Sequence, residues 1–434
     1  MLLTSPARIA QLHAAVDPLR RIKVPRDLEP LVSTSAGEQD PAAVGMSRER
    51  VEGIWRGALR LYRSGMYPAL GLCVRRHGEV VLDRSVGWAR GGGPSENAVR
   101  VAATPDTPYC VYSASKAVTA TVVHLLHERG LLDTDAPVAE YLPEFDRPHL
   151  DAITIDHVLS HRAGLPFVPR TLMDLDQFTE SAYLRSAVSG LRVRSVPGAV
   201  QSYHAVSGGF VLGEIVREVT GTDIGTVLRR EILDPLHFRW TGYGASLADQ
   251  ALVAHDYATG PRLLPPASLL LTRVLGMSLE ELVKVGRDPR FLGGVVPAGN
   301  VVTTANELSR FMDMLRQGGT LDGVSVMRKE TVRRALEQRS YHEFDRSLGL
   351  PIRFSAGYML GAKVLGLYGP DTDQAFGHLG FTNVMAWADP RREISVALMT
   401  NGNPVIGPHL PALWNLTRLI GAAAPKVDDP MLYR

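Results

Sequence analysis

The sequence predicts a mixed fold of the α/β (α+β) kind: an antiparallel sheet built from both ends of the chain and flanked by helices, with a mostly helical region inserted between them. Two observations predict it. Runs rich in β-branched and apolar residues occur at about residues 69–88 and again at 382–400, whereas the long middle of the chain carries helical patterns punctuated by Gly and Pro. One sheet assembled from both ends is the simplest arrangement that buries all of these strands.

The first expected elements are a helix and a hairpin. Residues 1–45 are irregular, and we expect them to form an extension that wraps the domain or a partly ordered arm. Ser47 is a plausible N-cap for a helix whose apolar residues recur at the i, i+3, i+4 and i+7 spacing. Two β-rich runs follow at residues 69–76 and 79–88, and His77-Gly78 between them predicts a tight turn.

The later elements begin with a helix that starts near Ser113. It runs to about residue 129, is apolar on more than one face, and is therefore expected to be buried, with Gly130 ending it. Towards the C-terminus, strands are expected at 382–388 and 393–400, joined by a turn, and a last helix at about 408–421.

These elements predict a division of the chain into an extension and two domains. Residues 1–45 form the extension, residues 46–105 and 295–434 form the sheet domain, and residues 106–294 form the mostly helical domain, with the functional site between the two. A chain of 434 residues is long enough for this.

Composition excludes several classes of protein. It is close to the average of globular proteins, which excludes collagen, disorder and disulfide scaffolds, and a net charge of +2 gives no reason to expect a nucleic-acid partner. Two cysteines cannot build a Cys-rich zinc site. Neither a secretory signal peptide nor a transmembrane stretch is recognisable, so we expect a cytoplasmic protein in which Cys73 and Cys110 stay reduced.

A candidate nucleophile lies at the start of the buried helix. Ser113-Ala114-Ser115-Lys116 places a lysine three residues after a serine, on the same helix face. Serine is a weak nucleophile that needs a neighbouring base, and a desolvated lysine can serve as one. Lys116 is also one of only six lysines in the chain. The alternative is that Ser113 is merely an N-cap and Lys116 a surface residue.

Two further short motifs carry chemistry. Tyr203, in Tyr203-His204-Ala205, could act as a proton shuttle if a nearby lysine lowers the pKa of its phenol, although an isolated tyrosine is more often a core residue. Gly377-His378-Leu379-Gly380 precedes a predicted strand, and the missing side chain of Gly380 would let a substrate carbonyl approach the backbone. The alternative for this motif is an ordinary turn before an edge strand.

In this order, the three motifs resemble the serine β-lactamase-like superfamily, which contains class C β-lactamases, DD-peptidases and the carboxylesterases built on the same fold. The resemblance extends from about residue 46 to 403. Residues 153–166 (ITIDHVLSHRAGLP) look like the family's loop after the nucleophile helix, and residues 299–312 and 318–323 look like a later helix and its Gly-Gly turn. The resemblance implies the β-lactamase/transpeptidase-like fold.

The resemblance also implies a role for each site residue. Ser113 would be the acylated nucleophile, Lys116 its activating base, and Tyr203 the group that carries the proton to and from the leaving group. The backbone N–H groups of Ser113 and Phe381 would form the oxyanion hole, with His378 and Gly380 next to the substrate. No cofactor and no metal are implied.

Two departures from the family's pattern point to the substrate. Where β-lactamases usually carry Asn in the second motif, this chain has Ala205, and where they carry Lys-Thr-Gly in the third motif, it has His378-Leu379-Gly380. A neutral histidine and a leucine are a weak site for a substrate carboxylate. We therefore expect a small uncharged ester of short to medium acyl chain length as the substrate, as in the esterase branch; the Gly-x-Ser-x-Gly elbow of α/β-hydrolases is absent.

Several other residues have both a functional and a structural interpretation. The spacing of His157 and His161 could ligate a metal, but structural roles are favoured for them and for His124 and His127. Cys110 is expected to be an inert buried thiol. The apolar stretch 263–275 either lines or covers an acyl pocket, or simply packs as a helix.

The sequence is also compatible with three alternatives to ester hydrolysis. The same acyl-enzyme could pass its acyl group to an alcohol or amine, which would make the protein an acyltransferase. The protein could be a β-lactamase or DD-peptidase. It could also be a catalytically silent binding protein that retains the fold.

Overall fold

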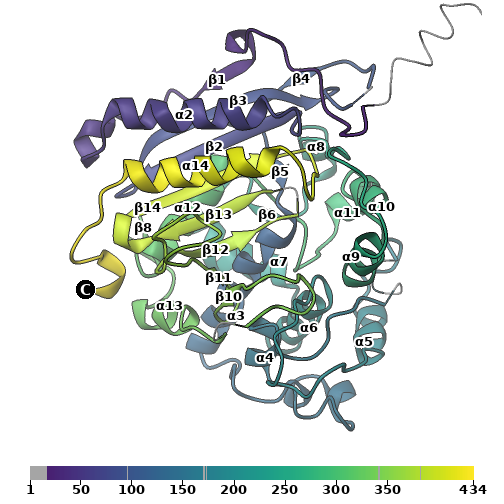
Figure 1. Ribbon diagram of the computed structural model, residues 1–434. Helices are drawn as coiled ribbons and strands as arrows, with labels where there is room; N and C mark the ends of the chain where they lie inside the picture. Colours follow the sequence, from purple (N-terminus) through teal and green to yellow (C-terminus); the bar gives the residue numbers. More distant parts are fainter. Residues whose placement is uncertain (1–16, 95, 170–171, 173, 341–342, 382) are drawn as a thin grey trace, which may run out of the picture.

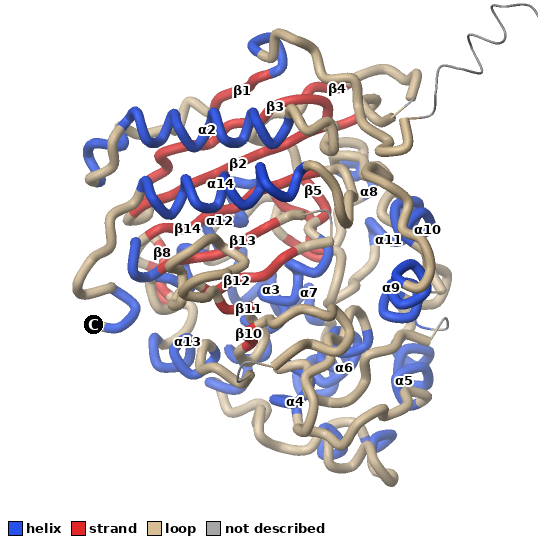
Figure 2. Tube along the Cα trace, in the orientation of Figure 1, coloured by secondary structure: helices blue, strands red, loops and turns tan. Residues whose placement is uncertain are grey.

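The computed structural model describes residues 17–94, 96–169, 172, 174–340, 343–381 and 383–434. Its central feature is a nine-stranded antiparallel sheet with the order β1-β3-β2-β14-β13-β12-β11-β10, in which β4 also pairs with β3 (Figures 1 and 2). The strands are β1 (Val32–Thr34), β2 (Ala69–Arg76), β3 (Glu79–Arg90), β4 (Val101–Ala102), β10 (Arg353–Phe354), β11 (Met359–Leu360), β12 (Phe376–Leu379), β13 (Met385–Asp389) and β14 (Ile394–Thr400).

The two ends of the chain meet in the middle of this sheet. Strand β2 pairs with β14 in antiparallel register, with Leu72 opposite Leu398. The predicted fold class, an antiparallel sheet built from both chain ends, is therefore confirmed. Part of the predicted extension also joins the sheet, because β1 pairs with β3 at one edge.

Both faces of the central strands are buried, because successive side chains of a strand point to opposite faces. Leu72 and Leu398 face α2 (Arg48–Tyr62) and α14 (His409–Ala423), which lie side by side across one face in Figure 1. Cys73 and Ala397 belong to the apolar core on the other face, which also contains the apolar side of α12 (Ala305–Arg316).

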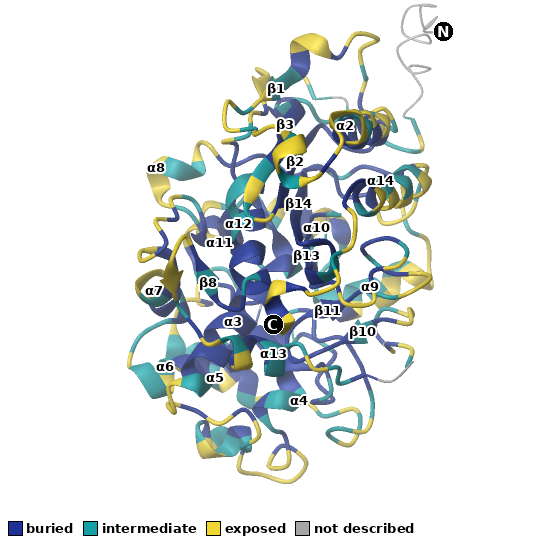
Figure 3. Cartoon of the chain, turned by 90° about the vertical axis from the view of Figure 1, so that its left-hand side faces the viewer, coloured by how far each residue is buried: buried dark blue, intermediate teal, exposed yellow. Residues whose placement is uncertain are grey.

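A second, three-stranded sheet supports the start of the buried helix. It has the order β5 (Tyr109–Cys110), β7 (Val301–Thr303) and β6 (Gly242–Tyr243), with Cys110 opposite Val302. Helix α3 (Ser115–Glu128) follows, and its residues 115–126 are all buried, as its apolar pattern predicts (Figure 3). Gly130 lies just beyond its end in the left-handed conformation.

The described part of the chain also contains further α-helices, one π-helix and two short strands that pair with each other. They are α4 (Ile155–Leu159), α5 (Ser181–Ser189), α6 (Ser207–Thr220), α7 (Ile224–Leu228), the π-helical η7 (Arg229–Leu233), α8 (Leu247–Gln250), α9 (Ala267–Leu275), α10 (Leu279–Val285), α11 (Pro289–Gly293), α13 (Lys329–Ala335), β8 (Thr320–Leu321) and β9 (Val324–Ser325). Among the described residues, no helix is long and apolar enough to cross a membrane.

Two predicted boundaries need correction. The strand expected from residue 382 begins at Met385, because the N–H of Gly380 bonds the carbonyl of Val384 and turns the chain there; Thr382 itself lies outside the described residues. The helix expected from Ser113 begins as a 3-10 turn, η3 (Tyr112–Ala114), before α3. The division into domains at residues 106 and 294 stays a prediction, and residues 1–16 of the predicted extension lie outside the described residues.

Candidate active site

Ser113 and Lys116 meet at the junction of η3 and α3. The three-residue spacing places Lys116 Nζ 3.2 Å from Ser113 Oγ. The same nitrogen donates to two backbone carbonyls, that of Ala205 at 2.7 Å and that of Ala298 at 3.1 Å. Ser113 is half-buried, whereas Lys116 is only 8% exposed. The structure therefore contradicts the alternative in which Lys116 is a surface residue.

Burial changes the proton affinity of this lysine. It lowers the pKa of Lys116 from 10.5 to about 7, because the surroundings disfavour the charged ammonium. A neutral amine has two hydrogens and one lone pair. Since the carbonyls of Ala205 and Ala298 take the two hydrogens, the lone pair is left facing the hydroxyl of Ser113.

Tyr203 completes this group. Its ring centroid lies 4.9 Å from Lys116 Nζ, and it shares a hydrogen bond with the side chain of Ser113. The pKa of Tyr203 is nevertheless raised, mainly by burial, and the hydrogen bond to Ser113 lowers it only in part. The idea that a neighbouring lysine lowers this pKa is therefore wrong: Tyr203 is a neutral phenol that can both donate and accept.

A buried carboxylate that the sequence motifs did not indicate holds Tyr203 in place. Asp345 Oδ1 accepts hydrogen bonds from the N–H groups of Tyr203 at 3.1 Å, Ser347 at 2.9 Å and Leu348 at 2.9 Å. Asp345 is completely buried. No local spacing could have identified it, because it is 142 residues from Tyr203 in the sequence.

His378 lies at the edge of the same group, on β12. Its ring is 6.2 Å from that of Tyr203, and its Nδ1–H donates to the carbonyl of Leu379 at 2.8 Å. Burial, followed by the nearby charge of Lys116, lowers the pKa of His378 to about 3. The histidine in the third motif is therefore neutral near pH 7.

Gly380 and Phe381 lie beside the residues that precede Ser113. A Cβ on Gly380 would be 2.3 Å from the carbonyl oxygen of Val111. The space left by the missing side chain is thus filled by protein backbone, which corrects the expectation that it admits a substrate carbonyl. Phe381 contacts the ring of Tyr112 edge-on, with centroids 6.3 Å apart.

The other candidate histidines have structural partners. His161 Nδ1 accepts the N–H of His204, and His204 Nε2 accepts the N–H of Leu165, both at 3.2 Å. His157 caps α4 with Thr154, and a ring nitrogen of His124 bonds the carbonyl of Ala356. Within the described part of the chain, no group of three or more His, Cys, Asp or Glu residues could hold a metal.

Three remaining sequence predictions concern His127, the cysteines and residues 263–275. His127 Nδ1 accepts the N–H of Thr134. Cys73 and Cys110 are free and buried, and burial raises the pKa of the Cys110 thiol.

The segment 263–275 contains α9, which exposes leucines on its outer side while Val274 is buried. Whether this helix lines an acyl pocket stays a prediction.

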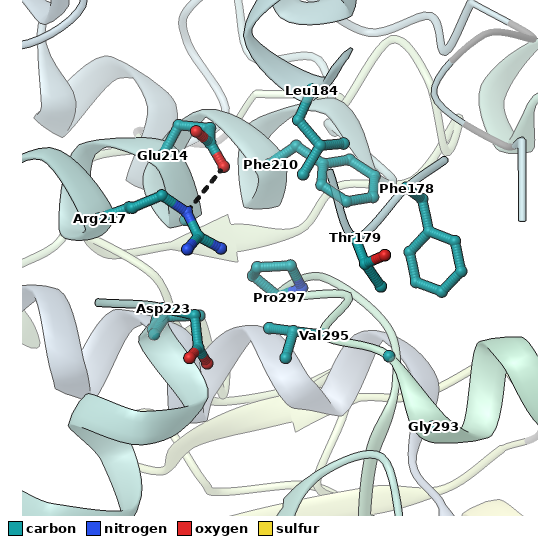
Figure 4. Close-up of a pocket in the computed structure, with 13 residues that line it drawn as sticks. Phe178, Thr179, Leu184, Phe210, Glu214, Arg217, Asp223, Gly293, Val295 and Pro297 are labelled. Carbon is teal, nitrogen blue, oxygen red and sulfur yellow. Dashed lines mark ion pairs between the residues drawn. The ribbon is translucent and has the colours of Figure 1, made fainter. Parts of the chain in front are cut away.

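A separate pocket lies in the helical region (Figure 4). It has a volume of about 220 Å³ and is lined by α6, α7 and residues 293–297, with Phe210, Glu214 and Arg217 among its walls. Arg217 Nε is 3.5 Å from Glu214 Oε1. Neither Ser113 nor Lys116 lines this pocket.

Comparisons with known proteins agree with this geometry. The family model described as Beta-lactamase matches residues 55–417. The esterase/beta-lactamase LipL of Mycobacterium tuberculosis (strain ATCC 25618 / H37Rv) is 29% identical over 370 residues, which cover 82% of each chain. The crystal structure of a penicillin-binding protein homologue from Caulobacter crescentus has a TM-score of 0.74 at 27% identity, and the match covers 87% of this chain and 99% of that one.

A family VIII carboxylesterase of known structure has the same fold. Its TM-score is 0.71 at 23% identity, and the match covers 86% of this chain and 98% of that one. The resemblance stated from the motifs is therefore confirmed along most of the sequence. Since the family model covers residues 55–417, which include the buried helix and the three motifs, this chain belongs to the Beta-lactamase family.

Proposed function

We propose that this protein is a serine hydrolase that cleaves carboxylic esters of short to medium acyl chains through an acyl-enzyme on Ser113. The arrangement around Lys116 Nζ is the observation that carries the proposal. Two carbonyls and the hydroxyl of Ser113 surround this nitrogen, and its pKa is about 7. A base with such a pKa is half deprotonated near neutral pH, where it can accept the proton of the serine.

In the acylation step, Ser113 Oγ attacks the carbonyl carbon of the ester while Lys116 Nζ takes the hydroxyl proton. The negative charge on the carbonyl oxygen is stabilised by the backbone N–H groups of Ser113 and Phe381. The tetrahedral intermediate collapses when the bond to the alcohol oxygen breaks. Tyr203 donates its proton to that oxygen and recovers one from Lys116, so that the alcohol leaves neutral.

In the deacylation step, water replaces the alcohol. Lys116, again neutral, removes a proton from the water through Tyr203 as the water oxygen attacks the acyl carbon. The bond to Ser113 Oγ then breaks, Ser113 regains a proton from Lys116, and the carboxylic acid leaves. The neutral phenol of Tyr203 suits this two-way transfer, because it donates and accepts without a stable charge.

The residues of the second and third motifs favour an uncharged substrate. Ala205 offers no side-chain hydrogen bond, Leu379 is apolar, and His378 is neutral with its Nδ1–H already engaged. A substrate carboxylate would find no cation among these three side chains. They therefore favour simple esters over penicillins or D-Ala-D-Ala peptides. Ester hydrolysis is part of the name of LipL, an esterase/beta-lactamase, and of the family VIII carboxylesterase.

The test compares wild type with Ser113→Ala and the control Ser189→Ala, whose hydroxyl only bonds the carbonyl of Ser186. Turnover is measured on p-nitrophenyl esters of increasing acyl length and on nitrocefin, and mass spectrometry locates the acyl adduct. We expect turnover of short and medium esters in wild type and Ser189→Ala, an adduct on Ser113, and a rate lower by a factor of at least about 10³ in Ser113→Ala. Wild-type rates in Ser113→Ala, or nitrocefin turnover exceeding ester turnover, would contradict the proposal.

A further inference from the structure

The residue that precedes Ser113 has an unfavourable backbone conformation. Tyr112 has φ +46°, in the left-handed region that a residue with a β-carbon rarely adopts. Such a conformation persists only where the surroundings over-determine it, and it is concentrated at functional sites. The peptide unit between Tyr112 and Ser113 carries the N–H of Ser113, so the dihedral angles of Tyr112 direct that N–H group.

One end of the Tyr112 side chain is anchored to a buried acid. The hydroxyl of Tyr112 donates to Asp256 Oδ2 at 2.8 Å, and each of the two residues is only 4% exposed. Asp256 is itself fixed, because Arg287 Nε donates to its backbone carbonyl at 2.7 Å. The hydroxyl of Tyr112 also packs against Gly286. Any side chain at this position would collide with it, because a Cβ there would lie 2.1 Å from the hydroxyl oxygen.

The ring of Tyr112 contacts the other side of the site. It meets the ring of Phe381 edge-on, with centroids 6.3 Å apart and planes at 69°. The neighbouring residues are also in close contact, since Gly380 lies directly against the carbonyl of Val111. Tyr112 thus adjoins Ser113 in the chain and touches Phe381 in space, the two residues whose N–H groups would stabilise the oxyanion.

We propose that Tyr112, anchored by Asp256, is a positioning residue that holds the N–H groups of Ser113 and Phe381 in place before substrate binds. This inference rests on the proposed function and deepens it. A preformed oxyanion site accelerates the reaction because its donors need not reorganise as charge develops. Losing the anchor would let the turn relax from its left-handed conformation and would misdirect the N–H of Ser113.

The experiment uses the full-length protein and four variants. Tyr112→Phe and Asp256→Leu remove the anchor, and Asp256→Asn keeps an oxygen that can accept the tyrosine hydrogen. The control is Tyr368→Phe, because Tyr368 is equally buried and its hydroxyl donates to the carbonyl of Met359 at 3.1 Å, in the sheet. For each protein we would measure Tm, kcat and KM on p-nitrophenyl acetate, and the rate at which a fluorophosphonate labels Ser113.

We expect Tyr112→Phe and Asp256→Leu to lower kcat and the labelling rate by about 10- to 100-fold, with KM changed less than about twofold. Asp256→Asn should restore most of the rate, and Tyr368→Phe should react like wild type despite a similar loss of Tm. If Tyr112 and Asp256 had only a structural role, Tm would fall in all of these variants, and kcat would not fall selectively while KM stayed nearly constant.

The outcomes distinguish this inference from the proposed function. If the fluorophosphonate does not label Ser113 in wild type, the proposed function fails. If wild type is labelled and Tyr112→Phe or Asp256→Leu reacts at the wild-type rate, the positioning role alone is overturned. Should Tyr112→Phe not fold, the comparison of Asp256→Leu with Asp256→Asn decides, because equal rates in these two variants overturn the role as well.

Discussion

The burial of Lys116 distinguishes it from the other lysines of the chain. It is buried among backbone carbonyls, whereas Lys23, Lys284, Lys329, Lys363 and Lys426 are exposed or half-buried. Burial without a carboxylate partner makes the ammonium unfavourable, and the pKa falls to about 7. Lys116, the proposed base, is therefore partly deprotonated near neutral pH, where its neutral amine is available to accept a proton.

The pH dependence of the reaction follows from this value. We expect kcat/KM on a p-nitrophenyl ester to rise with pH and level off with an apparent pKa of about 7, because only the neutral amine accepts the serine proton. Lys116→Met should lower kcat/KM by about 10³-fold, whereas the exposed control Lys284→Met should keep the wild-type profile. A rate that does not change between pH 5 and 8 would show that Lys116 is not the base.

The same pKa sets a dependence of stability on pH. In the unfolded chain Lys116 keeps its proton up to about 10.5, whereas in the folded chain it loses it near 7. Between these values the unfolded state binds more protons, so this group makes the free energy of unfolding rise with pH. In Lys116→Met this contribution should be absent, which urea unfolding at pH 6 and pH 9 would show.

At the scale of elements, the site depends on how closely strand β12 approaches η3. Gly380 follows β12, and the carbonyl of Val111 occupies the space where a side chain would be. This contact brings Phe381 next to Tyr112, the residue that precedes Ser113. The glycine is therefore required by the packing of two elements rather than by its own conformational freedom.

Gly380→Ala should separate these two elements. A Cβ at 2.3 Å from the oxygen of Val111 forces a backbone shift, and we expect a loss of about 1–3 kcal/mol in the free energy of unfolding together with a lower kcat. Gly299→Ala is the control, because its Cβ would meet only Val296 Cγ1 at an ordinary 3.6 Å. Urea unfolding and ester turnover measure both effects; equal behaviour of the two variants would refute the argument.

At the scale of the whole molecule, the β2–β14 pair joins the two ends of the chain. Leu398 is 1% exposed and lies opposite Leu72, on the face covered by α2 and α14. The two faces of the sheet carry two apolar cores: the core opposite α2 and α14 continues into α3, and the core beneath α2 and α14 includes Tyr203 and Ala205. Because both apolar cores pack against the same strands, we expect unfolding of the sheet to disrupt the arrangement of residues around Ser113 as well.

Leu398→Ala tests this link. Removing a buried leucine side chain should lower the free energy of unfolding by about 2–5 kcal/mol. We expect kcat to be unchanged in the absence of urea, because Leu398 lies on the sheet face that α2 and α14 cover. Activity and the circular dichroism of the variant should then be lost at the same, lower urea concentration. The exposed control Leu269→Ala should unfold like wild type, and loss of activity before loss of structure would contradict the link.

Sequence patterns were sufficient to predict the elements and the chemistry that depends on local spacing. The alternating and helical patterns predicted the hairpin, the buried helix and the C-terminal strands to within a few residues, because each pattern reflects the burial of that element alone. The spacing of Ser113 and Lys116 predicted their contact, because residues three apart lie on the same face of one helical turn.

Features that depend on residues far apart in the sequence became visible in the folded structure alone. Contacts between residues more than 80 positions apart surround the amine of Lys116 and fix the phenol of Tyr203. Contacts of the same kind place the carboxyl groups of Asp345 and Asp256 and require a glycine at position 380. No periodicity records such contacts, because desolvation and hydrogen bonding depend on which surfaces the packed sheet and helices bring together.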